Sequence, residues 1–178
     1  MKNKIIVVGM MLVLVAIYLG GCTQQQDPLK GLGYVNKQYG FGLNPPEGWT
    51  TDENNQFGAV VRFDSPIENG SAVDLGITKP YTLNASETLN IVVEQLLAQY
   101  PVTITNFTLV SNSARTANGM NAHEIIYTFV QGIYALKGRQ VIIEKNKKIF
   151  FLTYTALPDR YDIYNSVVEQ SINSFTIV

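Results

Sequence analysis

The sequence predicts an α+β domain in which a mostly antiparallel sheet is sandwiched by helices and which is preceded by an N-terminal signal helix. Three observations predict it. Short runs rich in β-branched and aromatic residues fill most of the chain, two segments carry apolar residues at three- and four-residue steps, and an apolar run opens the sequence. The 178 residues suffice for one domain with a sizeable core.

The first half of the folded region is expected to contain short strands followed by a helix. Strands are predicted at residues 34–36, 39–43, 57–63 and 72–78. The helix is predicted over residues 85–100, where Asn84 and Glu87 have the spacing of a capping box and Pro101 would end the helix.

The second half is expected to form an antiparallel meander closed by a helix. Strands are predicted at residues 105–115, 121–130, 135–144 and 148–156, and Asn118-Gly119 is a strong hairpin signal. The last of these runs is almost wholly apolar or β-branched, which is typical of a central strand covered on both faces. The closing helix is predicted to start after Pro158 with Asp159 as its cap, and residues 176–178 would add a short strand.

The N-terminus predicts export and lipid attachment. Residues 1–21 have a basic start and a 15-residue apolar run, which is too short to span a bilayer but typical of a signal peptide. Leu19-Gly20-Gly21-Cys22 resembles the lipobox of bacterial and archaeal lipoproteins, in which the cysteine thiol is acylated. The alternative is an uncleaved anchor helix. We therefore expect a lipidated Cys22, a flexible tether over residues 22–32 and a domain over residues 33–178, held on the extracytoplasmic face of the cell membrane.

Composition excludes several classes of function. A formal net charge of −1 and a pI near 5.8 argue against nucleic acid as a partner. One cysteine cannot form a disulfide within the chain, and one cysteine with one histidine cannot build a Cys/His zinc site. We expect a monomeric domain with no cofactor and no metal.

Motifs along the folded region resemble one family. The run Tyr39-Gly40-Phe41-Gly42-Leu43, then Pro46-Glu47-Gly48-Trp49, is similar to the opening of the PsbP-like domains. The strand at residues 148–154 and the closing helix ending in Ser174-Phe175 continue in the family's order. The resemblance spans about residues 39–178. It implies the PsbP/Mog/DcrB-type fold, and accessory or binding roles rather than enzymatic ones.

Few residues carry chemistry. His123 is the only imidazole, and because Glu124 points to the opposite face of a strand, we expect His123 to be a half-exposed strand residue without a catalytic role. A second hypothesis gathers five acids into a cation site, although they lack calcium-loop spacing; these are Asp52, Glu53, Asp64, Glu68 and Asp74. Trp49 is expected to plug the underside of the sheet, with an exposed anchor as the alternative.

Three sequons occur, at Asn69, Asn84 and Asn106. Asn84 is expected to act as a helix cap, which leaves Asn69 and Asn106 as candidate glycosylation sites in a host with the machinery.

These patterns predict a lipid-anchored, non-enzymatic PsbP-like domain that binds a protein partner or assists assembly at the membrane surface. The alternative is an envelope enzyme, or a receptor for a small ligand or metal, whose site is assembled from scattered residues. We further expect that no pocket holds two acids together with a basic or amide group, as acid–base catalysis would require.

Overall fold

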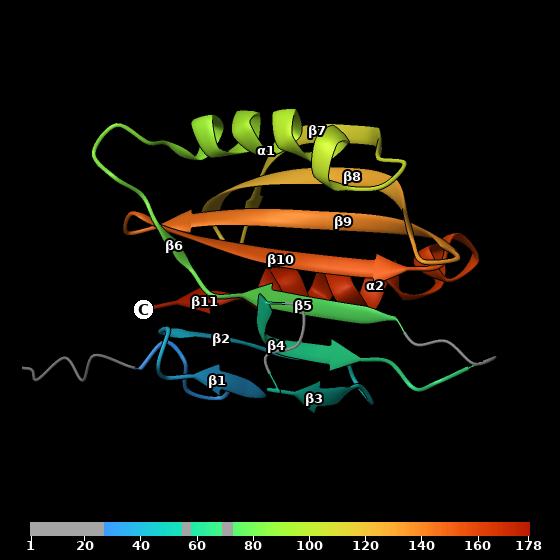
Figure 1. The fold of residues 1–178 in the computed structure, drawn as a ribbon. Coiled ribbons are helices and arrows are strands. Elements are labelled where there is room, and N and C mark those ends of the chain that lie inside the picture. Colours follow the sequence, from blue (N-terminus) through green and yellow to red (C-terminus); the bar gives the residue numbers. More distant parts are fainter. Residues whose placement is uncertain (1–26, 55–57, 69–72) are drawn as a thin grey trace, which may run out of the picture.

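The computed structural model describes residues 27–54, 58–68 and 73–178 (Figure 1). The predicted signal peptide, Cys22 and Asn69 lie outside these residues. Within them, no helix combines the length and the apolar character needed to cross a membrane.

The described residues form the following elements. The strands are β1 (Tyr34–Asn36), β2 (Phe41–Leu43), β3 (Thr50–Asp52), β4 (Ala59–Asp64), β5 (Asp74–Thr78), β6 (Tyr81–Thr82), β7 (Thr108–Ala117), β8 (Met120–Gln131), β9 (Tyr134–Lys145), β10 (Lys148–Ala156) and β11 (Thr176–Ile177). The helices are α1 (Leu89–Thr103) and α2 (Pro158–Ser174).

In the part of the chain that the structure describes, the strands form two sheets. The large sheet has the order β3-β4-β5-β10-β9-β8-β7, with β6 beside β10, and the small sheet has the order β1-β2-β11. All pairs are antiparallel. Figure 1 shows α1 along the β7–β9 end of the large sheet and α2 behind β10 and β5. The predicted α+β class, with its mostly antiparallel sheet and flanking helices, is confirmed.

Two tight turns set the register of the meander. Asn118 and Gly119 join β7 to β8 with φ of 48° and 72°, and Asn146 and Lys147 join β9 to β10 with φ of 54° and 61°. Two successive positive φ values are the geometry of the primed turns that suit the twist of antiparallel strands. The hairpin predicted at Asn118-Gly119 is therefore present.

Strand β10 lies at the centre of the large sheet and divides two apolar cores. Phe150, Leu152 and Tyr154 are fully buried on the α2 side, where the small sheet also packs. Ile149 lies on the other face, in the cluster that contains α1. The predicted central strand, covered on both faces, is therefore confirmed for the first half of β10. Farther along, the α1 side carries the half-buried Thr153 and Thr155.

The first helix begins later than the sequence suggested. Its N-cap is Thr88, whose Oγ1 accepts a hydrogen bond from the Ile91 N–H at 3.3 Å. Asn84 and Glu87 do exchange capping-box hydrogen bonds, but they close a separate turn before the helix, because Thr88 is extended with φ −132°. Pro101 lies inside the last turn, where losing one backbone donor still allows two more helical residues.

The closing helix begins at Pro158 with Leu157 as its N-cap, so Asp159 was wrongly predicted as the cap. Asp159 instead lies in the first turn, where its negative charge favours the helix dipole. The short strand predicted after this helix is present as β11.

The ordered domain begins before residue 33. The Asp27 carboxylate accepts a hydrogen bond from the Leu29 N–H at 3.0 Å, and the Leu32 N–H donates to the Leu29 carbonyl at 3.3 Å. Leu29 is buried and reaches toward Gly42 of β2. Residues 27–32, assigned above to the tether, are therefore part of the packed structure.

Gly138 allows an aromatic ring to cross β9. A Cβ atom at Gly138 would lie 2.7 Å from Cζ and 3.0 Å from the hydroxyl oxygen of Tyr127. The Tyr127 ring thus lies flat across the backbone of β9, toward β10. This is the aromatic cover that strand glycines commonly receive.

We expect Gly138→Ala to destabilise the domain by about 1–3 kcal/mol, because the added methyl group must displace the buried Tyr127 ring. Gly76→Ala is the matched control, since a Cβ there would meet its nearest atom at an ordinary 3.7 Å. Chemical denaturation measures both. Equal stability of the two variants would contradict the proposed role of Gly138.

Candidate functional site

The half of the sheet that α1 leaves uncovered contains a polar hollow of about 310 Å³. Its lining comes from four strands, β4, β5, β10 and the end of β8. The lining residues are Ala59, Arg62, Asp74, Gly76, Thr78, Gln131, Thr153 and Thr155. A cavity of this size accepts a small organic molecule.

Strand register explains why these residues meet. One row crosses the sheet from β8 to β4 through paired positions, namely Tyr127, Gly138, Thr155, Asp74 and Asp64. The neighbouring row pairs Thr153 with Gly76 and Gly76 with Arg62. Because Gly76 has no side chain, the floor of the hollow is open between Thr153 and Arg62.

The Asp74 carboxyl is the most perturbed acid in the hollow. Burial and, to a smaller extent, the negative charge of Asp64 raise its pKa to about 7, although Arg62 opposes the change. Within the described residues, no group donates a hydrogen bond to Asp74. This carboxyl is therefore partly protonated near neutral pH.

Arg62 is committed to two other acids. Its Nε lies 2.8 Å from Asp64 Oδ1, and its Nη2 lies 3.4 Å from Asp52 Oδ2. Close by, the hydroxyl of Thr78 is buried and, among the described residues, has no hydrogen-bond partner. The hollow thus contains a carboxyl and a hydroxyl whose hydrogen-bonding capacity is unused.

A second, shallower hollow of about 390 Å³ lies between the large sheet and α2. Arg115 and Arg139 each bind both Glu124 and Glu169, with three of the four ion pairs at 2.6 Å. Arg139 also donates to Asn165 Oδ1 at 3.0 Å. The expectation that no pocket holds two acids with a basic or amide group is therefore wrong.

The charges of this second hollow bind one another. Burial alone would raise the pKa of Glu169, but hydrogen bonds from Arg115 and Arg139 lower it to about 2. A carboxylate held so far below neutrality is a poor general acid or base at pH 7. We conclude that this cluster attaches α2 to β7, β8 and β9.

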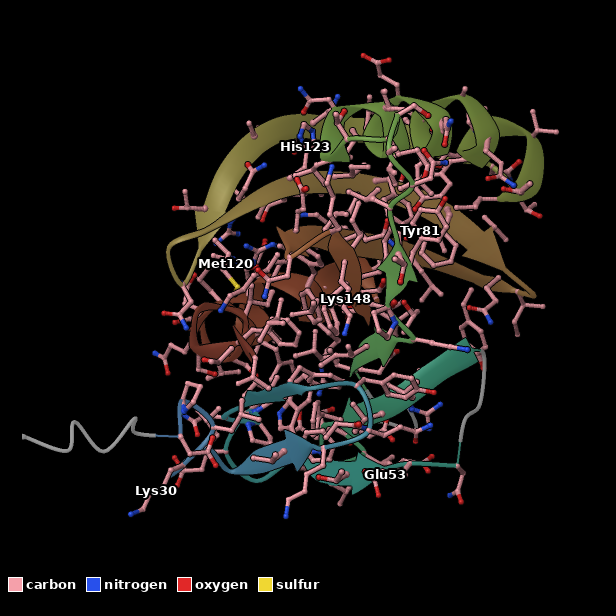
Figure 2. The ribbon with its side chains drawn as sticks, turned by 90° about the vertical axis from the view of Figure 1, so that its left-hand side faces the viewer. Lys30, Glu53, Tyr81, Met120, His123 and Lys148 are labelled. Atoms are coloured by element: carbon pink, nitrogen blue, oxygen red, sulfur yellow. The ribbon has the colours of Figure 1, made fainter. Side chains whose placement is uncertain are left out.

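His123 lies on β8, on the α1 side of the sheet, and Glu124 on the opposite side, as expected. Its ring Nε2 is hydrogen-bonded to Asn112 Oδ1, and burial lowers its pKa. Figure 2 places His123 and Glu53 at opposite ends of the molecule. Among the residues that the structure describes, no acid contacts this imidazole.

The five acids of the cation hypothesis are dispersed among different partners. Asp52 and Asp64 bind Arg62, Glu53 accepts a hydrogen bond from the Tyr34 hydroxyl at 2.6 Å, and Glu68 pairs with Arg160. In the described ranges, no three His, Cys, Asp or Glu side chains come together as a metal site would require.

The other residues named from the sequence are Trp49 and the sequon asparagines Asn84 and Asn106. Trp49 is half-buried and packs edge-on against Tyr164 of α2 at 5.7 Å, which favours the plug over the exposed anchor. Asn106 is exposed at a positive φ of 54°, and the side chain of Asn84 is occupied in its turn. Use of Asn106 as a glycosylation site stays a prediction.

Asp74 was among the acids of the cation hypothesis, but the hollow around it was not predicted from the sequence. The signals were present: alternate residues of β10, Thr153 and Thr155, are polar within an otherwise apolar strand, and Gly76 interrupts β5. What the sequence could not supply was the pairing of β5 with β10, which are separated by about seventy residues.

These features define an α+β domain whose antiparallel sheet carries one helix on each face and a polar hollow on the half-open face. The PsbP family model matches residues 31–177. The chain belongs to the PsbP family, as the motifs indicated.

Solved structures share this fold. Cyanobacterial PsbP (CyanoP) from Synechocystis has a TM-score of 0.61 at 16% identity, covering 82% of this chain and 91% of that chain. LpqN, involved in cell envelope biogenesis of Mycobacterium tuberculosis, has a TM-score of 0.57 at 15% identity, covering 78% and 83%. The Ran-binding protein Mog1p of Saccharomyces cerevisiae has a TM-score of 0.55 at 6% identity, covering 82% and 94%. No curated protein matches in sequence.

The depressed pKa of Glu169 predicts acid sensitivity. Its ion pairs stabilise the fold above the ordinary glutamate pKa near 4.5, and this contribution is lost as the pH falls toward 2. We expect Glu169→Gln to cost about 1–2 kcal/mol at pH 7, less than a fully buried pair because the side chain is one-third exposed.

Denaturation at pH 7 and pH 2 checks this prediction, with the exposed α1 acid changed in Glu94→Gln as control. The cost of Glu169→Gln should fall to a small part of its pH 7 value at the lower pH. A cost that is the same at both pH values would show that the ion pairs do not contribute.

Proposed function

We propose that the protein is a lipid-anchored, extracytoplasmic member of the PsbP family that binds a partner at the membrane surface without catalysing a reaction. The anchor rests on Leu19-Gly20-Gly21-Cys22, where the only cysteine of the chain occupies the position that acylation needs. Support for an envelope role comes from LpqN, which shares the fold and is described as involved in cell envelope biogenesis.

The observation that carries the non-catalytic role is the pairing of the charged groups. The four ionisable side chains Arg115, Glu124, Arg139 and Glu169 are closed by internal ion pairs. Catalysis of proton transfer needs a group with a pKa near the working pH and a free face toward the substrate. The cluster offers neither. Asp74 meets the first condition with its pKa of about 7, but the charged groups beside it, Arg62 and Asp64, are paired with each other.

Exposed apolar residues support a binding role. The turn between β8 and β9 carries Ile133, which is 89% exposed, and Tyr134, which is 56% exposed. In Figure 1 this turn lies at the opposite end of the domain from the C-terminus. Large exposed apolar side chains at a hairpin tip are typical of contact residues.

The second candidate function is that of a small-ligand receptor. The polar hollow favours it, because Asp74 and the Thr78 hydroxyl have unused hydrogen-bonding capacity there. Both candidates are binding proteins. They differ in whether the occupant is a free molecule or part of a protein.

Cys22→Ser should abolish lipid attachment, because serine has no thiol to form the thioether. The variant is expected in soluble fractions or as an uncleaved precursor, whereas Thr23→Ser should stay in membranes. Membrane fractionation with mass spectrometry of the N-terminus measures this. An intact N-terminus and an unmodified Cys22 in the wild-type protein would overturn the lipoprotein assignment.

His123→Ala tests the non-catalytic role. Because the imidazole contacts Asn112 and no acid, we expect the variant to support function fully in a complementation assay at unchanged abundance. Loss of function with normal fold and abundance would make His123 part of an active site.

A further inference from the structure

The hollow at the uncovered half of the sheet contains an acid without a hydrogen-bonded partner among the described residues. We propose that this hollow binds an alkylammonium group, with the Asp74 carboxylate as its counter-ion and the Thr155 hydroxyl as a further acceptor. The inference rests on the proposed binding function and names the chemistry of its occupant.

The hydrogen-bonding groups of the hollow suit an ammonium donor. An ammonium group carries three N–H donors and no acceptor. Thr155 is paired with Asp74 across the ladder between β10 and β5, so their side chains lie on the same face. Asp74 and Thr155 thus offer acceptors from two neighbouring strands at one end of the hollow. Thr78 lines the hollow at the other end of β5.

The local charge favours a cation over an anion. Three carboxyls, those of Asp52, Asp64 and Asp74, surround one guanidinium, that of Arg62. Its Nη2 donates to Asp64 at 3.1 Å and lies 3.4 Å from Asp52, so these two acids neutralise it. A bound cation would pair with the remaining carboxylate, that of Asp74. A bound anion would instead be repelled by the net negative charge of the site.

Asp74 gives the binding a pH dependence. The groups that face it are Arg62 and Asp64 of β4 and Tyr127 of β8, whose own pKa is raised to about 12 by burial and then by Asp74. Tyr127 therefore stays neutral near pH 7, and Asp74 alone titrates. Since a cation binds the ionised carboxylate, affinity should weaken below the Asp74 pKa of about 7 and level off above it.

The size of the hollow limits the occupant. A space of about 310 Å³ accepts a short alkyl chain bearing an ammonium group. Such a group can come from a free amine or from the lysine side chain of a protein partner. Both sources present the same chemistry to Asp74.

Isothermal titration of the full-length chain in a non-ionic detergent tests the proposal. The probes are putrescine, its neutral analogue butanediol and the dianion succinate, together with Nα-acetyl-lysine methylamide as a lysine side chain. We expect saturable binding of at least one ammonium probe and none of butanediol or succinate. Affinity should fall by about tenfold per pH unit below 7. Stronger binding of putrescine indicates a free amine, and stronger binding of the lysine derivative indicates a protein partner.

Two variants and one control locate the site. Asp74→Asn should abolish binding and its pH dependence, whereas Asp162→Asn, which removes an exposed acid of α2, should bind as the wild type does. Gly76→Leu keeps Asp74 but fills the floor of the hollow, and should also abolish binding. Thermal denaturation confirms that each variant is folded.

Several results would overturn the proposal: equal binding of butanediol or succinate, unchanged binding by Asp74→Asn or Gly76→Leu, or no binding of either ammonium probe at pH 8. The Cys22→Ser chain should bind the probe as well as the wild type does. Failure of lipid anchoring and failure of ammonium binding are therefore separate outcomes.

Discussion

Along β10, the side chains on the α1 side change from apolar to hydroxyl-bearing between Phe151 and Thr153, and the architecture of that face depends on this change. Ile149 and Phe151 pack in the cluster that contains α1. A helix laid farther along would have to desolvate Thr155 and Asp74 without returning hydrogen bonds, at about 1–3 kcal/mol for each group. The helix therefore covers half of the face, and the other half remains as the polar hollow.

The two helices are held to the sheet by different interactions. Apolar contacts attach α1, whereas α2 combines a buried apolar side, with Val168 and Ile172, and the ion pairs of Glu169 with Arg115 and Arg139. These ion pairs also favour one placement of α2, because any other placement leaves partly buried charges unpaired. The charges of this cluster therefore hold α2 against the sheet.

Local features of the fold could be predicted from the sequence because their signals are local. The Asn118-Gly119 turn, the apolar run of β10 and the stripe of α2 each depend on neighbouring residues. The start of α1 was misplaced because Asn84 and Glu87 form a valid capping box that Thr88 then interrupts. Strands β3 and β6 were missed because they are only three and two residues long and mostly exposed.

The candidate sites depend on pairings that no local pattern encodes. Arg115 and Glu169 meet across 54 positions, and Asp74 comes to lie beside Thr155 only through the ladder of β5 with β10. The acids near Arg62 were visible in the sequence as a scattered group. Their division into two bound carboxylates and one without a donor follows from strand register alone.

The contrast among these three acids connects the fold to function. Asp52 and Asp64 are paired with Arg62, and these ion pairs do not need an occupant of the hollow. Asp74 is instead partly neutralised by protonation near pH 7, which limits the cost of its burial in the empty site. A bound cation would replace that proton and restore the charge. Asp74 therefore costs the free protein little stability, and yet its carboxylate favours a positively charged ligand over a neutral one.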